Sequence, residues 1–296
     1  MSEALPRLLL PYRERAEAAL RRHLDVEGED GPASVRRAMA HSLFAAGKRV
    51  RPILVMLSHE AAGGEAPGID TVGAAIEMIH TYSLIHDDLP CMDDDDLRRG
   101  RPTCHVAFGE ALALLAGDAL LTRGMALLAE AEGVGPERRA RLVALVGEAI
   151  GTAGMIGGQV LDLAAEEDPV RSEGALEEIH RRKTGALLAA SVLAGAVAAG
   201  AAPAAEEGLL LYGRKLGLAF QVVDDLLDVT GSPEEMGKRL RKDEVRGKAT
   251  FPSLVGVDRS REIARRLAAE AIEALPFDTE AGALGALAQF VVDRIE

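Results

Sequence analysis

The chain has 296 residues, of which 48% are hydrophobic and 27% charged, and its formal net charge is −13 at pH 7. This composition is typical of a globular protein and excludes intrinsic disorder. The length allows one large domain or two ordinary ones around a buried core. The negative charge argues against a nucleic-acid partner, because no basic stripe is available to displace the counterions of a phosphate backbone.

Cysteine content and apolar stretches bear on where the protein acts. Cys91 and Cys104 are the only cysteines, and two in a chain of this length do not make a disulfide framework, so we expect a cytoplasmic protein. The first residues lack the basic region and apolar run of a signal peptide. The most apolar stretch, residues 186–202, is rich in Ala and Gly, and we predict a buried helix there rather than a membrane span.

Helix-forming residues dominate the sequence, with apolar positions spaced by three and four, which predicts an all-α protein. Gly and Pro separate the predicted helices at six places in chain order: residues 31–34, 63–68, 133–136, 167–169, 200–203 and 231–233. Because most of these breaks are short, as in a helical bundle, we predict a single domain over residues 1–296. Small residues such as Gly185 and Gly195 would let long helices pack closely.

The first acidic cluster consists of Asp87 and Asp88 followed by the run Asp93 to Asp96. A bare carboxylate next to apolar sequence is costly unless it is neutralised. Magnesium ions supply that charge, and they usually share carboxylate sites with the phosphates of a substrate. For Asp94, Asp95 and Asp96 a solvated acidic turn and metal binding both stay open.

Asp87 and Asp93 would point about 120° apart on an ideal helix, since they are six residues apart. Pro90 lacks an N–H group and disfavours helical geometry at Leu89. We therefore expect the helix to end or distort near Leu89, so that Asp93 returns to lie beside Asp87.

The second acidic cluster, Asp224-Asp225-Leu-Leu-Asp228, follows an apolar lead-in. Asp224 and Asp228 are four residues apart, so a continuous helix places both carboxylates on one face, about one turn apart. The apolar residues before them cover more than one face, which predicts a buried helix. Carboxylates leaving a buried helix again favour a metal site.

Basic residues stand at fixed places near these clusters. Lys48 and Arg51 are three residues apart and would lie on one side of a helix start, while Arg98 and Arg99 directly follow the first acidic cluster. An Arg guanidinium matches phosphate oxygens as a fork, and Lys adds a point charge. The acids and bases together predict a site that handles diphosphates.

These motifs closely resemble those of the trans-isoprenyl diphosphate synthases, in particular the bacterial farnesyl diphosphate synthases. The similarity extends over nearly the whole chain, in residues 47–52, 80–90, 92–100, 158–163, 183–185, 220–228 and 247–252. It implies the isoprenoid synthase fold, in which long helices surround a deep central cavity, and it implies a homodimer. Both acidic clusters and the basic residues are intact, as in an active member of the family.

The resemblance implies three Mg2+ ions per active site, for which Mn2+ can substitute. Asp87 and Asp93 would hold two of them and Asp224 the third. Asp88 and Asp228 are further possible metal ligands.

The resemblance also assigns the substrate contacts. The implied contacts of the allylic diphosphate or its metals are Arg98, Lys183, Gln221 and Lys238. Those of the second substrate, isopentenyl diphosphate, are Lys48, Arg51, His80 and Arg99. Lys183 and Thr184 would also place dipoles near the carbocation, and with Gln221 they form the implied catalytic set. Lys248 would add positive charge near the departing pyrophosphate.

The implied reaction condenses isopentenyl diphosphate with dimethylallyl and geranyl diphosphate to give farnesyl diphosphate. Mg2+, Lys and Arg would stabilise the pyrophosphate that leaves as the allylic cation forms. Tyr82 lies five residues before Asp87, about 7.5 Å deeper along a helix axis. In the resembling family a bulky aromatic here marks farnesyl synthases, and the neighbouring Ser83 is too small to close the cavity.

Three other functions compete with this interpretation. Geranylgeranyl diphosphate synthases share every motif above, and Tyr82 could be a core residue that faces away from the cavity. Terpene cyclases also carry an Asp-rich motif on an all-α fold, but they lack the second diphosphate contacts at Lys48, Arg51 and Arg99. A non-catalytic partner subunit of a prenyl synthase would be expected to lose the metal-binding acids.

Overall fold

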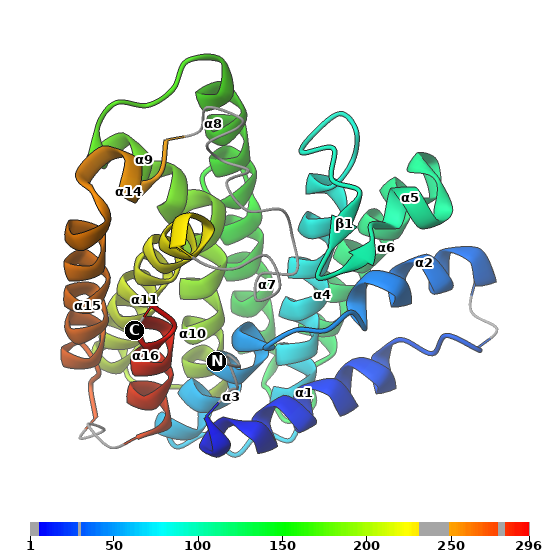
Figure 1. Ribbon diagram of the computed structural model, residues 1–296. Helices are drawn as coiled ribbons and strands as arrows, with labels where there is room; N and C mark the ends of the chain where they lie inside the picture. Colours follow the sequence, from blue (N-terminus) through cyan, green and yellow to red (C-terminus); the bar gives the residue numbers. More distant parts are fainter. Residues whose placement is uncertain (1–5, 29–30, 231–248, 278–281, 296) are drawn as a thin grey trace.

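The computed structural model describes residues 6–28, 31–230, 249–277 and 282–295 (Figure 1). Within these ranges the regular structure is almost entirely helical, and a two-stranded antiparallel hairpin of β1 (Leu97–Arg98) and β2 (Arg101–Pro102) is the only sheet. The all-α prediction is confirmed.

The helices have the following bounds in chain order: η1 Arg7–Leu9, α1 Leu10–His23, α2 Ala33–Leu43, α3 Val50–Ala61, α4 Ile69–Asp87, α5 Cys104–Phe108, α6 Glu110–Glu130, α7 Pro136–Ile150, α8 Met155–Glu167, α9 Glu173–His180, η2 Arg181–Gly185, α10 Ala186–Ala199, α11 Pro203–Thr230, α14 Phe251–Val255, α15 Val257–Glu273 and α16 Ala283–Asp293. Within the described residues, helices end at the Gly and Pro breaks that the sequence predicts. For example, α10 ends before Gly200, whose φ of 77° continues no right-handed helix.

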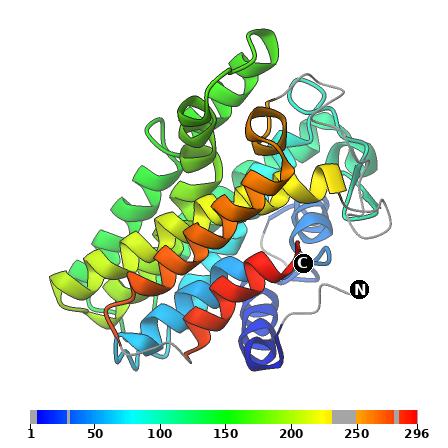
Figure 2. The same cartoon turned by 60° about the vertical axis from the view of Figure 1, so that its left-hand side comes forward.

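Two groups of buried apolar side chains form the core. One surrounds α4 and α6, the other surrounds α11, α15 and α16, and residues of α3 and α10 belong to both. Helices α10, α11 and α15 run side by side (Figure 2). Close approach of α3 and α10 depends on Gly195, because a Cβ there would collide with Ser58 Oγ and the backbone oxygen of Val55. The prediction that small residues let the helices pack closely is confirmed at this crossing.

Several of the core helices are strongly apolar. In the part of the chain that the structure describes, three helical stretches are long and apolar enough to cross a membrane by length and composition alone: Glu110–Glu130, Pro136–Glu167 and Glu173–Ala199. The most apolar window of the third is 67% buried, and nearly all of α10 within it is core, as predicted for residues 186–202. That the chain lacks a membrane span stays a prediction.

Candidate active site

The first acidic cluster lies where α4 ends. Helix α4 stops at Asp87, and the backbone N–H of Asp93 donates a hydrogen bond to the Asp87 carbonyl oxygen at 2.7 Å. The turn between them passes through Pro90, and Asp94 directly after it adopts a φ of 47°. The expected end of the helix near Leu89 and the return of Asp93 to Asp87 are both confirmed.

The Asp87 carboxylate is held in a largely buried position. Gln159 on α8 donates a hydrogen bond from Nε2 to Asp87 Oδ1 at 2.6 Å. Burial raises the pKa of Asp87 to about 6; Lys183 lowers this pKa and the charge of Asp93 raises it further. Because burial makes the ionised form of Asp87 unfavourable, a bound cation would stabilise that form.

Lys183 and Thr184 lie in η2, a single turn of π-helix between α9 and α10. Lys183 Nζ lies 2.7 Å from Asp162 Oδ2 of α8. Although burial opposes its charged form, Asp162, Asp87 and Asp93 hold the pKa of Lys183 above its ordinary value. Such π-turns occur often at functional sites, and this one places a cation next to the first acidic cluster.

Asp88 and Arg98 form a forked pair. The Arg98 guanidinium donates from Nε and Nη2 to the Asp88 carboxylate at 2.8 and 2.6 Å, and Asp88 is 3% exposed. This pair joins hairpin β1–β2 to the end of α4. Asp88 therefore holds Arg98 in place here, and its role as a metal ligand stays a prediction.

The second acidic cluster lies on one continuous helix, α11, as the sequence predicts. Its three aspartates have different surroundings. Asp224 is partly exposed, and its Oδ1 lies 3.0 Å from Nη1 of Arg294, which follows α16 and stacks on the Phe220 ring. Asp225 and Asp228 are both buried.

Arg51, His80 and Arg99 form a basic group, because the charges of Arg51 and Arg99 both act on His80. Burial lowers the pKa of Arg51 to about 10, with Glu77 and Asp224 opposing and Arg99 adding to the effect. Burial and the cations Arg51 and Arg99 hold the pKa of His80 well below its ordinary value. Arg51 Nε is buried without a hydrogen-bond partner among the described residues. Two guanidinium groups whose charge is opposed by burial, beside a neutral imidazole, would bind an anion favourably.

Lys48 departs from the expected position. Helix α3 begins at Val50, and Arg49 before it has a φ of 54°, so Lys48 lies outside the helix and does not share one side of it with Arg51. The prediction of a common helix face is wrong. The cause is the buried guanidinium of Arg49, which donates to Glu17, to Glu77 and to two backbone oxygens. Lys48 Nζ instead lies over the ring of Phe290, 5.5 Å from its centroid.

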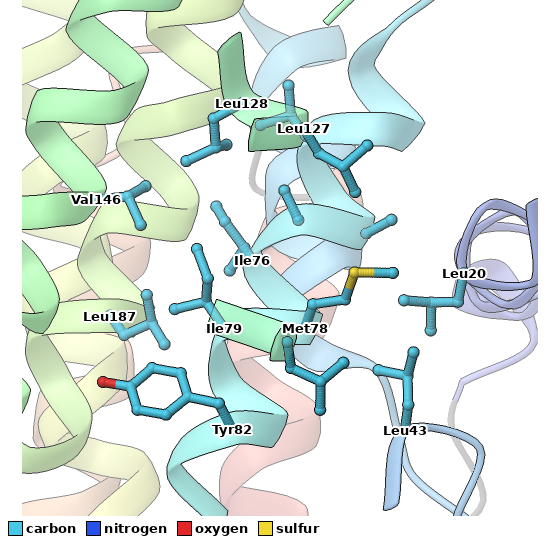
Figure 3. Close-up of a cluster of buried hydrophobic side chains, with 14 of the residues drawn as sticks. Leu20, Leu43, Ile76, Met78, Ile79, Tyr82, Leu127, Leu128, Val146 and Leu187 are labelled. Atoms are coloured by element: carbon cyan, nitrogen blue, oxygen red, sulfur yellow. The ribbon is translucent and has the colours of Figure 1, made fainter. Parts of the chain in front are cut away.

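Tyr82 lies on α4, five residues before Asp87, and is buried in the core near Ile79 and Leu187 (Figure 3). Its ring meets that of His86 edge-on, with 5.6 Å between centroids. Burial, and then the charge of Asp87, raise the pKa of Tyr82 to about 12, so the phenol is neutral. Ser83 is half-buried, and its Oγ donates to the His80 carbonyl oxygen.

Two carboxylates, those of Asp87 and Asp93, are suited to hold Mg2+ together with a substrate, and they do not enclose the ion with protein ligands alone. No group of three or more His, Cys, Asp or Glu side chains that could hold a metal occurs among the described residues. Mg2+ is commonly held by one or two carboxylates together with substrate phosphates. Asp87 and Asp93 meet that description, whereas Asp224 lies with Arg294 and Arg51 instead. The three-ion arrangement stays a prediction.

Sequence reasoning assigned no role to Gln159, Asp162, Arg49 or Arg294. The first two lie in the stretch 158–163 that carried part of the resemblance, and three-residue spacing on α8 could have indicated a shared face. Thr184 and Gln221 are half-buried, on η2 and α11. Lys238 and Lys248 lie outside the described residues.

Comparison with known proteins identifies the family. The sequence signature of the polyprenyl synthetase family matches residues 32–282. The chain belongs to that family. This confirms the resemblance to trans-isoprenyl diphosphate synthases and the prediction of a prenyltransferase of isoprenoid biosynthesis.

Individual relatives differ in product. The chain is 48% identical over 270 residues to Geranylgeranyl pyrophosphate synthase 11, chloroplastic, from Arabidopsis thaliana, covering 89% of this chain and 75% of that protein. It is 47% identical over 268 residues to the chloroplastic geranylfarnesyl diphosphate synthase of Leucosceptrum canum, covering 89% and 74%. Among solved structures, an FPP/GFPP synthase from Zymomonas mobilis is 37% identical, with a TM-score of 0.85 and 96% and 97% coverage. The fold of this family member is thus the isoprenoid synthase fold.

Proposed function

We propose that this polyprenyl synthetase condenses isopentenyl diphosphate with allylic diphosphates and that its main product is geranylgeranyl diphosphate. The observation that carries the condensation is the presence of two separate charged groups. Asp87, Asp93 and Lys183 form one, suited to a metal-bound diphosphate. Arg51 and His80 belong to the other, suited to a bare diphosphate. A terpene cyclase, with one diphosphate substrate, would need only the first.

The residues divide the reaction between them. Asp87 and Asp93 would hold Mg2+, which when bound supplies Lewis-acid stabilisation of the leaving diphosphate. Lys183 adds a positive charge on the same side. The allylic C–O bond breaks and pyrophosphate leaves with the electron pair. The double bond of isopentenyl diphosphate, held near Arg51 and His80, then forms the new C–C bond. We expect the departing pyrophosphate to accept the proton that is lost.

The twenty-carbon product is supported by relatives that are identical to this chain at nearly half of the aligned positions. Those at 47–48% identity include several named geranylgeranyl pyrophosphate synthases. Farnesyl diphosphate is the second candidate, and Tyr82 favours it, because a buried ring just below Asp87 leaves less room for a growing chain. A putative farnesyl-diphosphate synthase from Marinomonas with 36% identity agrees with this second candidate.

A homodimer and a cytoplasmic location are also part of the proposal. Large apolar side chains are exposed on α6 and α8, among them Leu114, Leu115, Val160 and Leu161. Exposed apolar surface of this kind is typical of an association face. Light scattering on the purified chain would show twice the monomer mass if the dimer forms.

One assay tests the function. Purified protein is incubated with Mg2+, dimethylallyl diphosphate and labelled isopentenyl diphosphate, and the dephosphorylated products are separated by chain length. A twenty-carbon main product would support the proposal, and a fifteen-carbon product would support the candidate based on Tyr82. Failure to extend dimethylallyl, geranyl or farnesyl diphosphate would refute the condensation itself.

A further inference from the structure

Asp225 stands next to Asp224 in the second acidic cluster but faces the protein interior. It is 8% exposed, and its Oδ2 accepts a hydrogen bond of 2.9 Å from the backbone N–H of Phe251. The same oxygen lies 3.2 Å from His180 Nε2. This one oxygen therefore contacts His180, which comes well before Asp225 in the chain, and Phe251, which comes well after it.

The two residues that Asp225 contacts, His180 and Phe251, also contact each other. The His180 ring stacks on the Phe251 ring, with 5.8 Å between centroids and 23° between planes. A capping box of Thr250 and Ser253 fixes the first turn of α14 and with it the direction of the Phe251 N–H. His180, Asp225 and Phe251 are all buried. We call these three residues the buried triad.

The buried triad joins α14 to two elements near the proposed chemistry, α9 and α11. His180 is the last residue of α9 and is followed directly by η2, which bears Lys183. Asp225 is adjacent to Asp224 on α11. Phe251 begins α14. Arg51 and His80, which we propose to bind isopentenyl diphosphate, lie on α3 and α4, and among the described residues the triad forms no hydrogen bond with these two helices.

We propose that His180 and Asp225 are positioning residues, which set the place of the Lys183 turn relative to Asp224 for the ionisation step. The proposal rests on the proposed function. Asp225 then contributes through the hydrogen bonds of its buried oxygen, and not as a metal ligand. Because misplacement of a reacting group by about 1 Å can cost roughly a hundredfold in rate, loss of the His180–Asp225 contact should reduce kcat.

The test compares His180→Phe, which keeps an aromatic ring against Phe251 but removes Nε2, with Asp225→Ala and the double variant. We expect each single variant to lose roughly tenfold to a hundredfold in kcat, while KM for isopentenyl diphosphate changes by less than about twofold. The double variant should be no slower than the slower single variant, since both remove one contact. Asp225→Asn, which keeps an oxygen for the Phe251 N–H, should recover most of the kcat lost in Asp225→Ala.

His59→Gln is the matched control. His59 is buried in the last turn of α3, whereas Arg51 lies in the first; its Nδ1 is 3.2 Å from the Gly195 carbonyl oxygen and its Nε2 accepts from the Ala66 N–H. This variant should lower the melting temperature while keeping kcat. A purely structural role of the triad would make His180→Phe behave in the same way, and that result would overturn the proposal.

Other results are equally decisive. Losses in kcat that multiply in the double variant would show that His180 and Asp225 act independently. A raised Mg2+ requirement in Asp225→Asn but not in His180→Phe would make Asp225 a metal ligand. Should Asp225→Ala fail to fold, the cycle is run with Asp225→Leu, which also lacks an acceptor oxygen but fills more of the buried space. An inactive wild-type protein would refute the proposed function instead, whereas an active wild type with unaffected variants refutes only the positioning role.

Discussion

Neighbouring residues in both acidic clusters have opposite surroundings, and these surroundings decide what each side chain can bind. Asp87 faces Lys183 and Asp93, whereas Asp88 is forked by Arg98. Asp224 is partly exposed beside Arg294, whereas Asp225 is turned inward. Sequence composition alone gives all of these residues the same charge. Only the folded chain distinguishes a carboxylate that is available to a ligand from one that already has a partner.

Asp87→Asn should stabilise the metal-free protein at neutral pH. The folded-state pKa of Asp87 is about 6, above its ordinary value of 3.8, so the unfolded state ionises first and the charged carboxylate destabilises the fold. The penalty, roughly 2–3 kcal/mol, is fully present above pH 6 and disappears as pH falls towards 4. Urea unfolding in chelator at pH 4, 6 and 8 measures it. A variant that is less stable than wild type at pH 8 would contradict this picture.

Arg51→Ala should raise KM for isopentenyl diphosphate by about tenfold to a hundredfold, because it removes one charge-assisted contact. The KM of the allylic substrate should change much less, since Arg51 lies apart from Asp87 and Lys183. Arg141→Ala, which removes an exposed ion pair with Glu206, serves as the control. Equal effects on both substrates in steady-state assays would disprove separate sites.

Tyr82→Ala should lengthen the main product by at least one five-carbon unit. The substitution removes a buried ring beside Ile79 and Leu187, five residues before Asp87, which we propose to anchor the metal-bound diphosphate. Tyr82→Phe keeps the ring and should keep the product. Chromatography of dephosphorylated products from all three proteins gives the answer, and an unchanged profile in Tyr82→Ala would place the limit on chain length elsewhere.

At the scale of elements, the positions of helices were more predictable than their partners. The five Gly and Pro breaks predicted within the described residues all separate helices, although the break between α7 and α8 was not predicted. Pro90 predicted the turn that returns Asp93 to Asp87, because its effect on the backbone is local. The hydrogen bond from Gln159 to Asp87 could not be predicted in this way, since it joins α8 to α4 across 72 positions. The left-handed Arg49 was missed for the same reason: its partners come from three separate parts of the chain.

Gly195→Ala should destabilise the crossing of α3 and α10. The new methyl group would collide with the Val55 backbone oxygen, and two packed helices would have to separate to admit it. Overpacking of this kind costs roughly 1–3 kcal/mol. Gly174→Ala near the start of α9 is the matched control, because a Cβ there meets no atom within 4 Å. Thermal unfolding of both variants measures the difference, and equal melting temperatures would show that the crossing can relax.

At the scale of the whole molecule, apolar contacts between helices form the core, whereas the proposed metal site needs a cation from outside the chain. The two core clusters consist of apolar side chains from helices that pack directly against one another. The acidic cluster at the end of α4, by contrast, keeps a carboxylate with a pKa raised by burial. Removal of the metal should therefore stop the reaction without unfolding the protein.

Excess chelator should abolish condensation while leaving the helical circular dichroism unchanged, and Mg2+ or Mn2+ should restore activity. The apparent affinity for Mg2+ should weaken as pH falls below about 6, because protons then compete for Asp87. Activity titrations with Mg2+ at several pH values test both statements. Full turnover in chelator, or unfolding by it, would exclude a substrate-linked metal site.

Arg49 has a practical consequence for any alanine scan of this protein. It stands between Lys48 and Arg51, yet the residue is only 3% exposed. Its guanidinium donates hydrogen bonds to Glu17, Glu77 and two backbone oxygens. Removing the guanidinium leaves buried acceptors without a donor. Arg49→Ala should therefore lower the yield of soluble, folded protein and leave the kcat of the folded molecules unchanged. A screen that scores activity per cell would therefore rank position 49 with its neighbours as substrate contacts, although yield and not turnover had changed.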